Sequence, residues 1–213
     1  MKTDELITML ATGVEPVQPH VPEKLISKAL LTGVAISFIL LLTFYGIRPD
    51  IKEVSSTFPF WMKVGVPFAN VVLGLVFIFA LAHPGKLPKI NYWVLLIPIA
   101  ALWTWAIWTW VNADPSQHSE MLWGKTWRVC IKNIAFLAVP TAVATLFALR
   151  NLAPTQPMLS GAIAGWLAGG VGASVYALHC PEMAAPFLAV WYVLGMLVPT
   201  AIMAWVGNRS LRW

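Results

Sequence analysis

Residues 158–182 read MLSGAIAGWLAGGVGASVYALHCPE, an uncharged hydrophobic run that ends in a short polar motif. The run over residues 158–178 is long enough to cross a bilayer, which takes about 20 apolar residues in a helix. Within it, Gly161, Gly165 and Gly169 recur at every fourth position, a pattern that lets another membrane helix approach closely. The stretch therefore predicts a transmembrane helix that packs tightly against a neighbour.

Similar uncharged runs recur along the rest of the chain. The 213 residues are 59% hydrophobic and only 11% charged, whereas a soluble domain carries about 25% charged residues. We expect an all-α, polytopic membrane protein, with a bundle of six transmembrane helices over residues 27–213 and a short cytoplasmic N-terminal segment over residues 1–26. The predicted spans are residues 29–47, 64–82, 92–111, 130–149, 158–178 and 184–206.

The N-terminal segment is polar and interrupted by prolines, and it lacks the features of a cleavable signal peptide. Asp4 and Glu5 are placed favourably for the first turn of a short helix. Leu6, Ile7 and Leu10 then fall on one face of it. Two interpretations are open, an interfacial helix at a frayed terminus or a docking helix for a soluble partner.

The distribution of positive charge favours cytoplasmic termini. An even number of spans places both termini on one side of the membrane. With the termini inside, the inner segments hold eight Lys and Arg residues and the outer segments hold six, which agrees with the positive-inside rule. The charged residues behind the net charge of +5 thus lie in the segments between the spans and near the termini. They form no basic cluster on a soluble fold, so we expect no direct binding to nucleic acid.

The two cysteines of the chain fall on the same face of the membrane. Cys130 lies where the fourth span begins, and Cys180 lies where the fifth span ends. With cytoplasmic termini this face is the external one, where thiols can be oxidised. The pair lacks the C-x-x-C spacing of a zinc site. A functional thiol pair, a structural disulfide and packed free thiols remain three open interpretations.

Residues near Cys130 favour a reactive thiol. Arg128 and Lys132 flank it in the first turn of its helix, where positive charge and the helix N-terminus stabilise a thiolate. Glu182 is the candidate carboxylate partner for these basic side chains across the bundle.

Two histidines on the same face are candidate supports for the thiols. His179 directly precedes Cys180, and His118 lies in the preceding outer segment. Thiolates and imidazoles suit a soft metal ion, so Cys130 and Cys180 are candidate metal ligands.

The chain lacks the sequence motifs of several common enzyme classes. It contains no Gly-rich phosphate loop, H-E-x-x-H or G-x-S-x-G motif. The predicted spans also lack the ionisable residues of an ion or proton pathway. We expect no catalysis and no obligatory cofactor. The competing hypotheses are a membrane thiol oxidoreductase that exchanges electrons with quinone and a structural membrane subunit.

Several short motifs occur together, in order, along the whole chain. They are MKTDELI at residues 1–7, GIRPD at residues 46–50, the turn around Cys130, HCPE at residues 179–182, Trp191-Tyr192 and Leu211-Arg212-Trp213. In this combination the chain resembles the NrsF-type membrane anti-sigma factors, six-span inner-membrane proteins of proteobacteria.

The resemblance implies a function that composition does not show. Proteins of this type hold an extracytoplasmic-function sigma factor inactive on the cytoplasmic side and release it on exposure to heavy metals or oxidants. Cys130 and Cys180 match the sensing cysteines of the family. The resemblance therefore implies a transient heavy-metal ion at this pair, and a sigma factor bound on the N-terminal side of the membrane.

Overall fold

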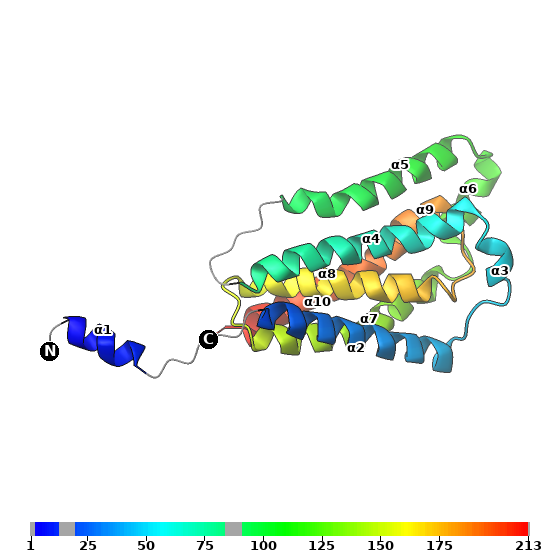
Figure 1. The fold of residues 1–213 in the computed structure, drawn as a ribbon. Coiled ribbons are helices and arrows are strands. Elements are labelled where there is room, and N and C mark those ends of the chain that lie inside the picture. Colours follow the sequence, from blue (N-terminus) through cyan, green and yellow to red (C-terminus); the bar gives the residue numbers. More distant parts are fainter. Residues whose placement is uncertain (1–2, 13–19, 84–90, 213) are drawn as a thin grey trace.

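The computed structural model describes residues 3–12, 20–83 and 91–212. These residues form helices joined by turns, with no strand among them (Figure 1). The α-helices are α1 (Thr3–Ala11), α2 (Val21–Phe44), α3 (Ile51–Val54), α4 (Phe58–Leu81), α5 (Ile97–Val111), α6 (His118–Trp123), α7 (Trp127–Arg150), α8 (Pro157–Tyr176), α9 (Ala185–Phe187) and α10 (Val193–Ser210). Two 3₁₀ helices, η1 (Tyr92–Leu96) and η2 (Pro115–Gln117), and one π-helix, η3 (Leu188–Tyr192), complete them.

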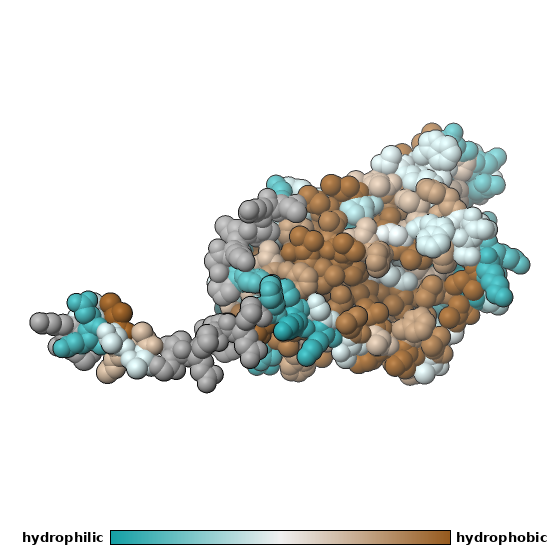
Figure 2. All heavy atoms as spheres, viewed as in Figure 1, coloured by the Kyte–Doolittle hydropathy of each residue, from teal (hydrophilic) through white to brown (hydrophobic). Residues whose placement is uncertain are grey.

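The predicted all-α membrane fold is confirmed. Among the described residues, six helical stretches are long and apolar enough to cross a membrane. They are Val21–Phe44, Phe58–Leu81, Tyr92–Val111, Pro115–Arg150, Pro157–Tyr176 and Ala185–Ser210. Figure 2 shows the matching surface, in which hydrophobic residues cover the middle of the visible face and hydrophilic residues gather mostly towards its two ends.

The helix α4 begins earlier than the second predicted span, which was placed at residues 64–82. It starts at Phe58, with a proline in its first turn, a position where proline favours helix initiation because its missing N–H needs no partner there. Lys63, which the sequence placed between spans, consequently lies inside the helix and is buried.

The helix α8 lies in the centre of the bundle, between α4, α7 and α10 (Figure 1). Its glycines let these neighbours approach closely. A Cβ atom added at Gly165 would lie 2.7 Å from Cβ of Met203 in α10, and one added at Gly172 would lie 2.9 Å from the amide nitrogen of Ala138 in α7. The small residues at these positions therefore serve helix packing. In contrast, α5 lies at the edge of the bundle (Figure 1).

The bundle has two distinct ends. At one end, called here the terminus end, lie the beginning of α2, the end of α4 and the end of α10 (Figure 1). At the other end, called the thiol end, lie α3, α6, α9 and the segment that joins α8 to α9 (Figure 1). An even number of crossings is consistent with this arrangement.

Replacing Gly165 by alanine should destabilise the bundle, because the added methyl group would force α8 and α10 apart. We expect a loss of about 1–3 kcal/mol in the free energy of unfolding, the usual cost of overpacking a core. Equilibrium unfolding by sodium dodecyl sulfate in mixed micelles would measure it. Gly65→Ala is the matched control, since no heavy atom outside its own helix backbone lies within 4 Å of the added Cβ. Equal destabilisation by the two changes would contradict the close packing.

Candidate thiol site at one end of the bundle

Cys180 lies directly after the last turn of α8. Its backbone N–H donates to the carbonyl oxygen of Tyr176 at 3.0 Å, as does the N–H of His179 at 3.0 Å. Pro181 follows, and it prevents the helix from continuing because it has no N–H to donate. The chain therefore turns across the thiol end here, with the Cys180 side chain fully buried.

Cys130 lies in the first turn of α7 and faces the same interior. Its N–H donates to the carbonyl oxygen of Thr126 at 3.0 Å, and its side chain is also fully buried. Thr126 links the two cysteines, because its carbonyl oxygen accepts from Cys130 and its hydroxyl lies 4.0 Å from Sγ of Cys180. Both cysteines are free thiols. From the order of the spans, the sequence predicted Cys130 and Cys180 on the same face of the membrane. The structure places both at the same end of the bundle.

Glu182 joins the Cys180 segment to the start of α7. Its Oε1 accepts hydrogen bonds from the backbone N–H groups of Lys125 at 2.7 Å and Thr126 at 3.1 Å, and from the Thr126 hydroxyl at 3.3 Å. Such an anion at a helix N-terminus satisfies free N–H groups and interacts favourably with the helix dipole. The carboxylate therefore contacts main-chain donors, whereas the sequence suggested basic side chains as its partners.

Gly124 makes room for this contact. Its φ of 52° favours glycine, and an added Cβ atom would lie 2.6 Å from Oε2 of Glu182.

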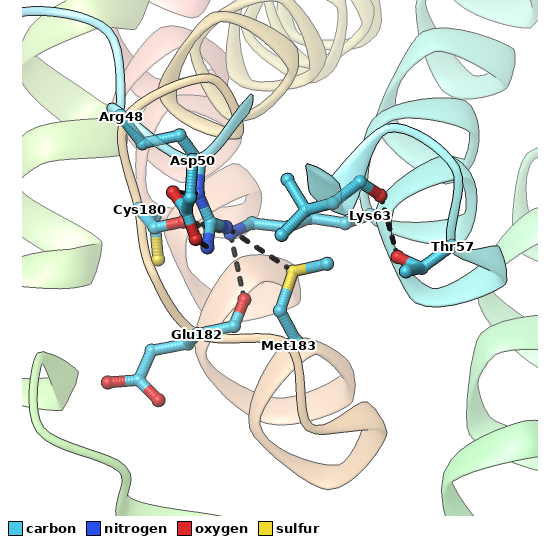
Figure 3. A network of polar contacts seen from close by, with 8 residues as sticks. Arg48, Asp50, Thr57, Lys63, Cys180, Glu182 and Met183 are labelled. Atoms are coloured by element: carbon cyan, nitrogen blue, oxygen red, sulfur yellow. Dashed lines mark hydrogen bonds and ion pairs between the residues drawn. The ribbon is translucent and has the colours of Figure 1, made fainter. Parts of the chain in front are cut away.

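Two cations that the sequence did not assign to the site bind the Cys180 segment from the other side (Figure 3). Nζ of Lys63 donates to the carbonyl oxygens of Cys180 at 2.5 Å and Glu182 at 2.8 Å. Nη1 of Arg48 donates to the same Cys180 oxygen at 3.2 Å. Lys63 is only 1% exposed, and within the described residues no ion pair with a carboxylate compensates its charge.

Arg48 is itself held by Asp50. Nε and Nη2 of the guanidinium each donate to a different carboxylate oxygen at 2.7 Å, a bidentate pair. These hydrogen bonds lower the pKa of the Asp50 carboxyl and raise the pKa of the Arg48 guanidinium. The backbone N–H of Arg48 also donates to the carbonyl oxygen of Leu178 at 3.0 Å. The GIRPD motif of residues 46–50 therefore stabilises the chain directly after α8 through the hydrogen bonds of Arg48.

The predicted supporting histidines occupy two different places. His179 lies beside Cys180 in sequence, but its Nδ1 lies 3.1 Å from the carbonyl oxygen of Gly46 and its ring packs near Tyr45. His118 stacks on Trp110 with ring centroids 4.1 Å apart, and its Nε2 lies 3.0 Å from the Trp110 carbonyl oxygen. Neither contact involves a thiol.

The basic residues near Cys130 lie on the opposite face of α7. Arg128 and Lys132 are exposed, and the Arg128 guanidinium lies 5.2 Å from the ring centroid of Trp127. The buried cation of the site is Lys63, which contacts the backbone carbonyl oxygen of Cys180. In the part of the chain that the structure describes, no group of three or more His, Cys, Asp or Glu side chains is arranged to hold a metal ion.

Lys63 could have been found from its sequence context. It stands within FPFWMKVGVPF, with apolar residues on both sides. A basic residue so placed marks either a span boundary or a buried functional cation.

The N-terminal helix α1 stands apart from the bundle (Figure 1). None of its residues is buried, and Leu6, Ile7 and Leu10 are 38%, 58% and 67% exposed. Asp4 and Glu5 lie in its first turn, as the sequence predicted. The helix therefore presents an apolar face that the described part of the chain does not cover.

Comparison with known proteins now identifies the chain. A family profile described as "Negative regulator of sigma F" matches residues 10–213. The chain belongs to the NrsF family. The resemblance seen in the short motifs is confirmed by this match.

Two NrsF relatives match along the full length of both chains. A protein of Azospira oryzae named "Probable anti-sigma-F factor NrsF" is 40% identical over 216 residues. A protein of Caulobacter vibrioides named "Anti-sigma-F factor NrsF" is 34% identical over 215 residues. No solved structure matches the chain.

Removing the Glu182 carboxylate should expose the buried thiols. Glu182→Ala leaves the N–H groups of Lys125 and Thr126 without their acceptor, at a cost of about 1–3 kcal/mol. Since each 1.4 kcal/mol changes an opening equilibrium about tenfold, alkylation of Cys180 by iodoacetamide should become about fivefold to 140-fold faster. Mass spectrometry of the labelled protein measures the rate.

Glu120→Ala is the control, because Glu120 is exposed and contributes its backbone oxygen, which the change retains, to the turn before α7. If both variants alkylate at the wild-type rate, Glu182 does not hold the segment closed.

Proposed function

We propose that this protein is a membrane-bound anti-sigma factor of the bacterial inner membrane, which holds an extracytoplasmic-function sigma factor inactive. The family match over residues 10–213 supports this function. The two full-length relatives named as anti-sigma-F factors support it too. A soluble sigma factor bound to such a protein is kept away from RNA polymerase until it is released.

Both termini lie in the cytoplasm in this proposal, and the sigma factor binds the N-terminal segment. The exposed apolar face of Leu6, Ile7 and Leu10 supports this assignment. An amphipathic helix of this kind docks into an apolar groove of a partner. Asp4 and Glu5 flank that face and add a charged rim.

The signal acts at the thiol end, which faces the periplasm in this proposal. The observation that supports it best is that two buried free thiols, Cys130 of α7 and Cys180 after α8, both neighbour Thr126. Thiolates are preferred ligands of soft heavy metals. Oxidation of the pair to a disulfide removes two electrons and two protons and joins the same two segments covalently. Either event changes how α7 and the Cys180 segment pack.

Replacing both Cys130 and Cys180 by serine should abolish the response and leave repression intact. Serine is close in size to cysteine but binds soft metals poorly and forms no disulfide. A reporter transcribed by the sigma factor should therefore stay silent in cadmium or hydroperoxide. His118→Ala is the control and should respond normally, because His118 contacts Trp110 and not a thiol. Normal induction in the double serine variant would refute the thiol sensor.

Deleting residues 2–12 should release the sigma factor without any stress signal. Constitutive reporter transcription and loss of co-purification with the sigma factor would both follow. Leu10→Asp is a point variant that places a charge on the apolar face and should also release the sigma factor. Thr8→Ala is its control and should repress normally, because the Thr8 hydroxyl donates to the carbonyl oxygen of Asp4 in the same helix. Persistent repression by the deletion variant would assign docking to the loops of the terminus end.

A further inference from the structure

The helix α4 is tied by polar contacts at both of its ends. At the thiol end, Lys63 donates to the carbonyl oxygens of Cys180 and Glu182. At the terminus end, Nε2 of His83, just after α4, lies 3.4 Å from Oε1 of Glu23 in the first turn of α2. The 24 residues of α4 span about 36 Å at 1.5 Å per residue. One continuous helix therefore connects the thiol site with the beginning of α2.

The contact at the terminus end is built into the turn that closes α4. Nδ1 of His83 lies 2.8 Å from the carbonyl oxygen of Phe79, which orients the ring so that Nε2 faces Glu23. Glu23 stands in the first turn of α2, the next helix after α1, and lies within the N-terminal segment of residues 1–26. A displacement of the end of α4 thus acts on that segment.

Glycines at the interface between α4 and α8 leave no Cβ atoms that would interlock the two helices at these positions. A Cβ atom added at Gly170 would lie 2.8 Å from Cγ2 of Val71, and one added at Gly74 would lie 3.3 Å from Cβ of Leu167. Small shear movements of packed helices are a common form of conformational switching. One buried hydrogen bond, from Nε1 of Trp166 to Oδ1 of Asn70 at 3.2 Å, fixes the resting position.

We propose that α4 couples the thiol site to the N-terminal segment, with Lys63 and His83 as the positioning residues at its two ends. The inference rests on the proposed function and names the element that carries its signal. A cadmium ion that binds both Cys180 and Cys130, with release of the two thiol protons to water, displaces the Cys180 segment. Because Lys63 is bound to two carbonyl oxygens of that segment, α4 follows it. His83 then transmits the shift to Glu23.

The test measures sigma-factor release, since a chain of contacts alone does not demonstrate coupling. The full-length protein is placed in lipid nanodiscs, and its Kd for the fluorescently labelled sigma factor is measured by anisotropy with and without cadmium chloride. The ratio of the two Kd values is the release ratio. For the wild type we expect a ratio of about tenfold or more, a typical allosteric coupling.

His83→Ala should keep the resting Kd within about twofold of the wild type and lower the release ratio to about one. His83→Gln, whose amide can still bond to Glu23, should restore part of the ratio. His118→Ala is the matched control with an unchanged ratio, because that histidine lies at the thiol end against Trp110. A merely structural histidine would change the resting Kd and the release ratio together.

Lys63→Met should also lower the release ratio, and Lys63→Arg should restore it because arginine keeps the charge and the donors. Lys132→Met is the control, since Lys132 is an exposed cation on α7. Cadmium capture is followed separately by the ultraviolet absorption of cadmium–thiolate bonds. It should persist in His83→Ala, which is remote from the thiols.

The outcomes distinguish a failure of the proposed coupling through α4 from a failure of the proposed function on which it rests. Wild-type release ratios in both His83→Ala and Lys63→Met would overturn the role of α4 and leave the anti-sigma function standing. Loss of resting affinity in His83→Ala that His83→Gln does not restore would also overturn it, because the histidine would then serve docking or folding. A wild-type protein that captures cadmium without releasing the sigma factor would refute the sensing function itself.

Discussion

The thiol end depends on one buried charge, the ammonium group of Lys63. In a membrane domain such a charge is costly unless polar groups surround it. Here the carbonyl oxygens of Cys180 and Glu182 accept its hydrogen bonds, and the ring of Tyr192 lies 5.6 Å from Nζ. The Cys180 segment can supply these oxygens only if its backbone turns across the end of the bundle. The backbone conformation that buries the Cys180 thiol is therefore the same one that provides hydrogen-bond acceptors for Lys63.

The same segment is held from its opposite side by the N-terminus of α7. The Glu182 carboxylate accepts hydrogen bonds from the N–H groups of Lys125 and Thr126, which directly precede α7 and have no acceptor within it. On the other side, Lys63 is buried and would otherwise lack hydrogen bonds, at a cost of about 1–3 kcal/mol. The Cys180 segment is therefore held on both sides, and this keeps Cys180 buried at the end of the bundle where α7 begins with Cys130 in its first turn.

The hydrophobic pattern predicted the fold because length and composition decide which segments cross a membrane. The order of the spans then predicted that Cys130 and Cys180 lie on the same face of the membrane, and this needed no knowledge of how the helices pack. Lys63 was missed because a hydropathy pattern ends a span at a charge, whereas the helix begins at Phe58 and buries that charge against carbonyl oxygens. Main-chain donors and acceptors leave no trace in a sequence pattern, so the partners of Glu182 and Lys63 required the folded chain.

The complete burial of both thiols bears on how such a sensor would respond. A reagent reaches Cys130 or Cys180 only when the site opens, because each side chain is 0% exposed. That opening breaks the contacts that hold the segment between α8 and α9, which are those of Lys63 with its carbonyl oxygens and of Glu182 with the N–H groups of Lys125 and Thr126. If the pair senses metals or oxidants, its threshold is then a property of these polar contacts as much as of thiol chemistry. Relatives with the same two cysteines can differ in sensitivity through residues that never touch the metal or the oxidant.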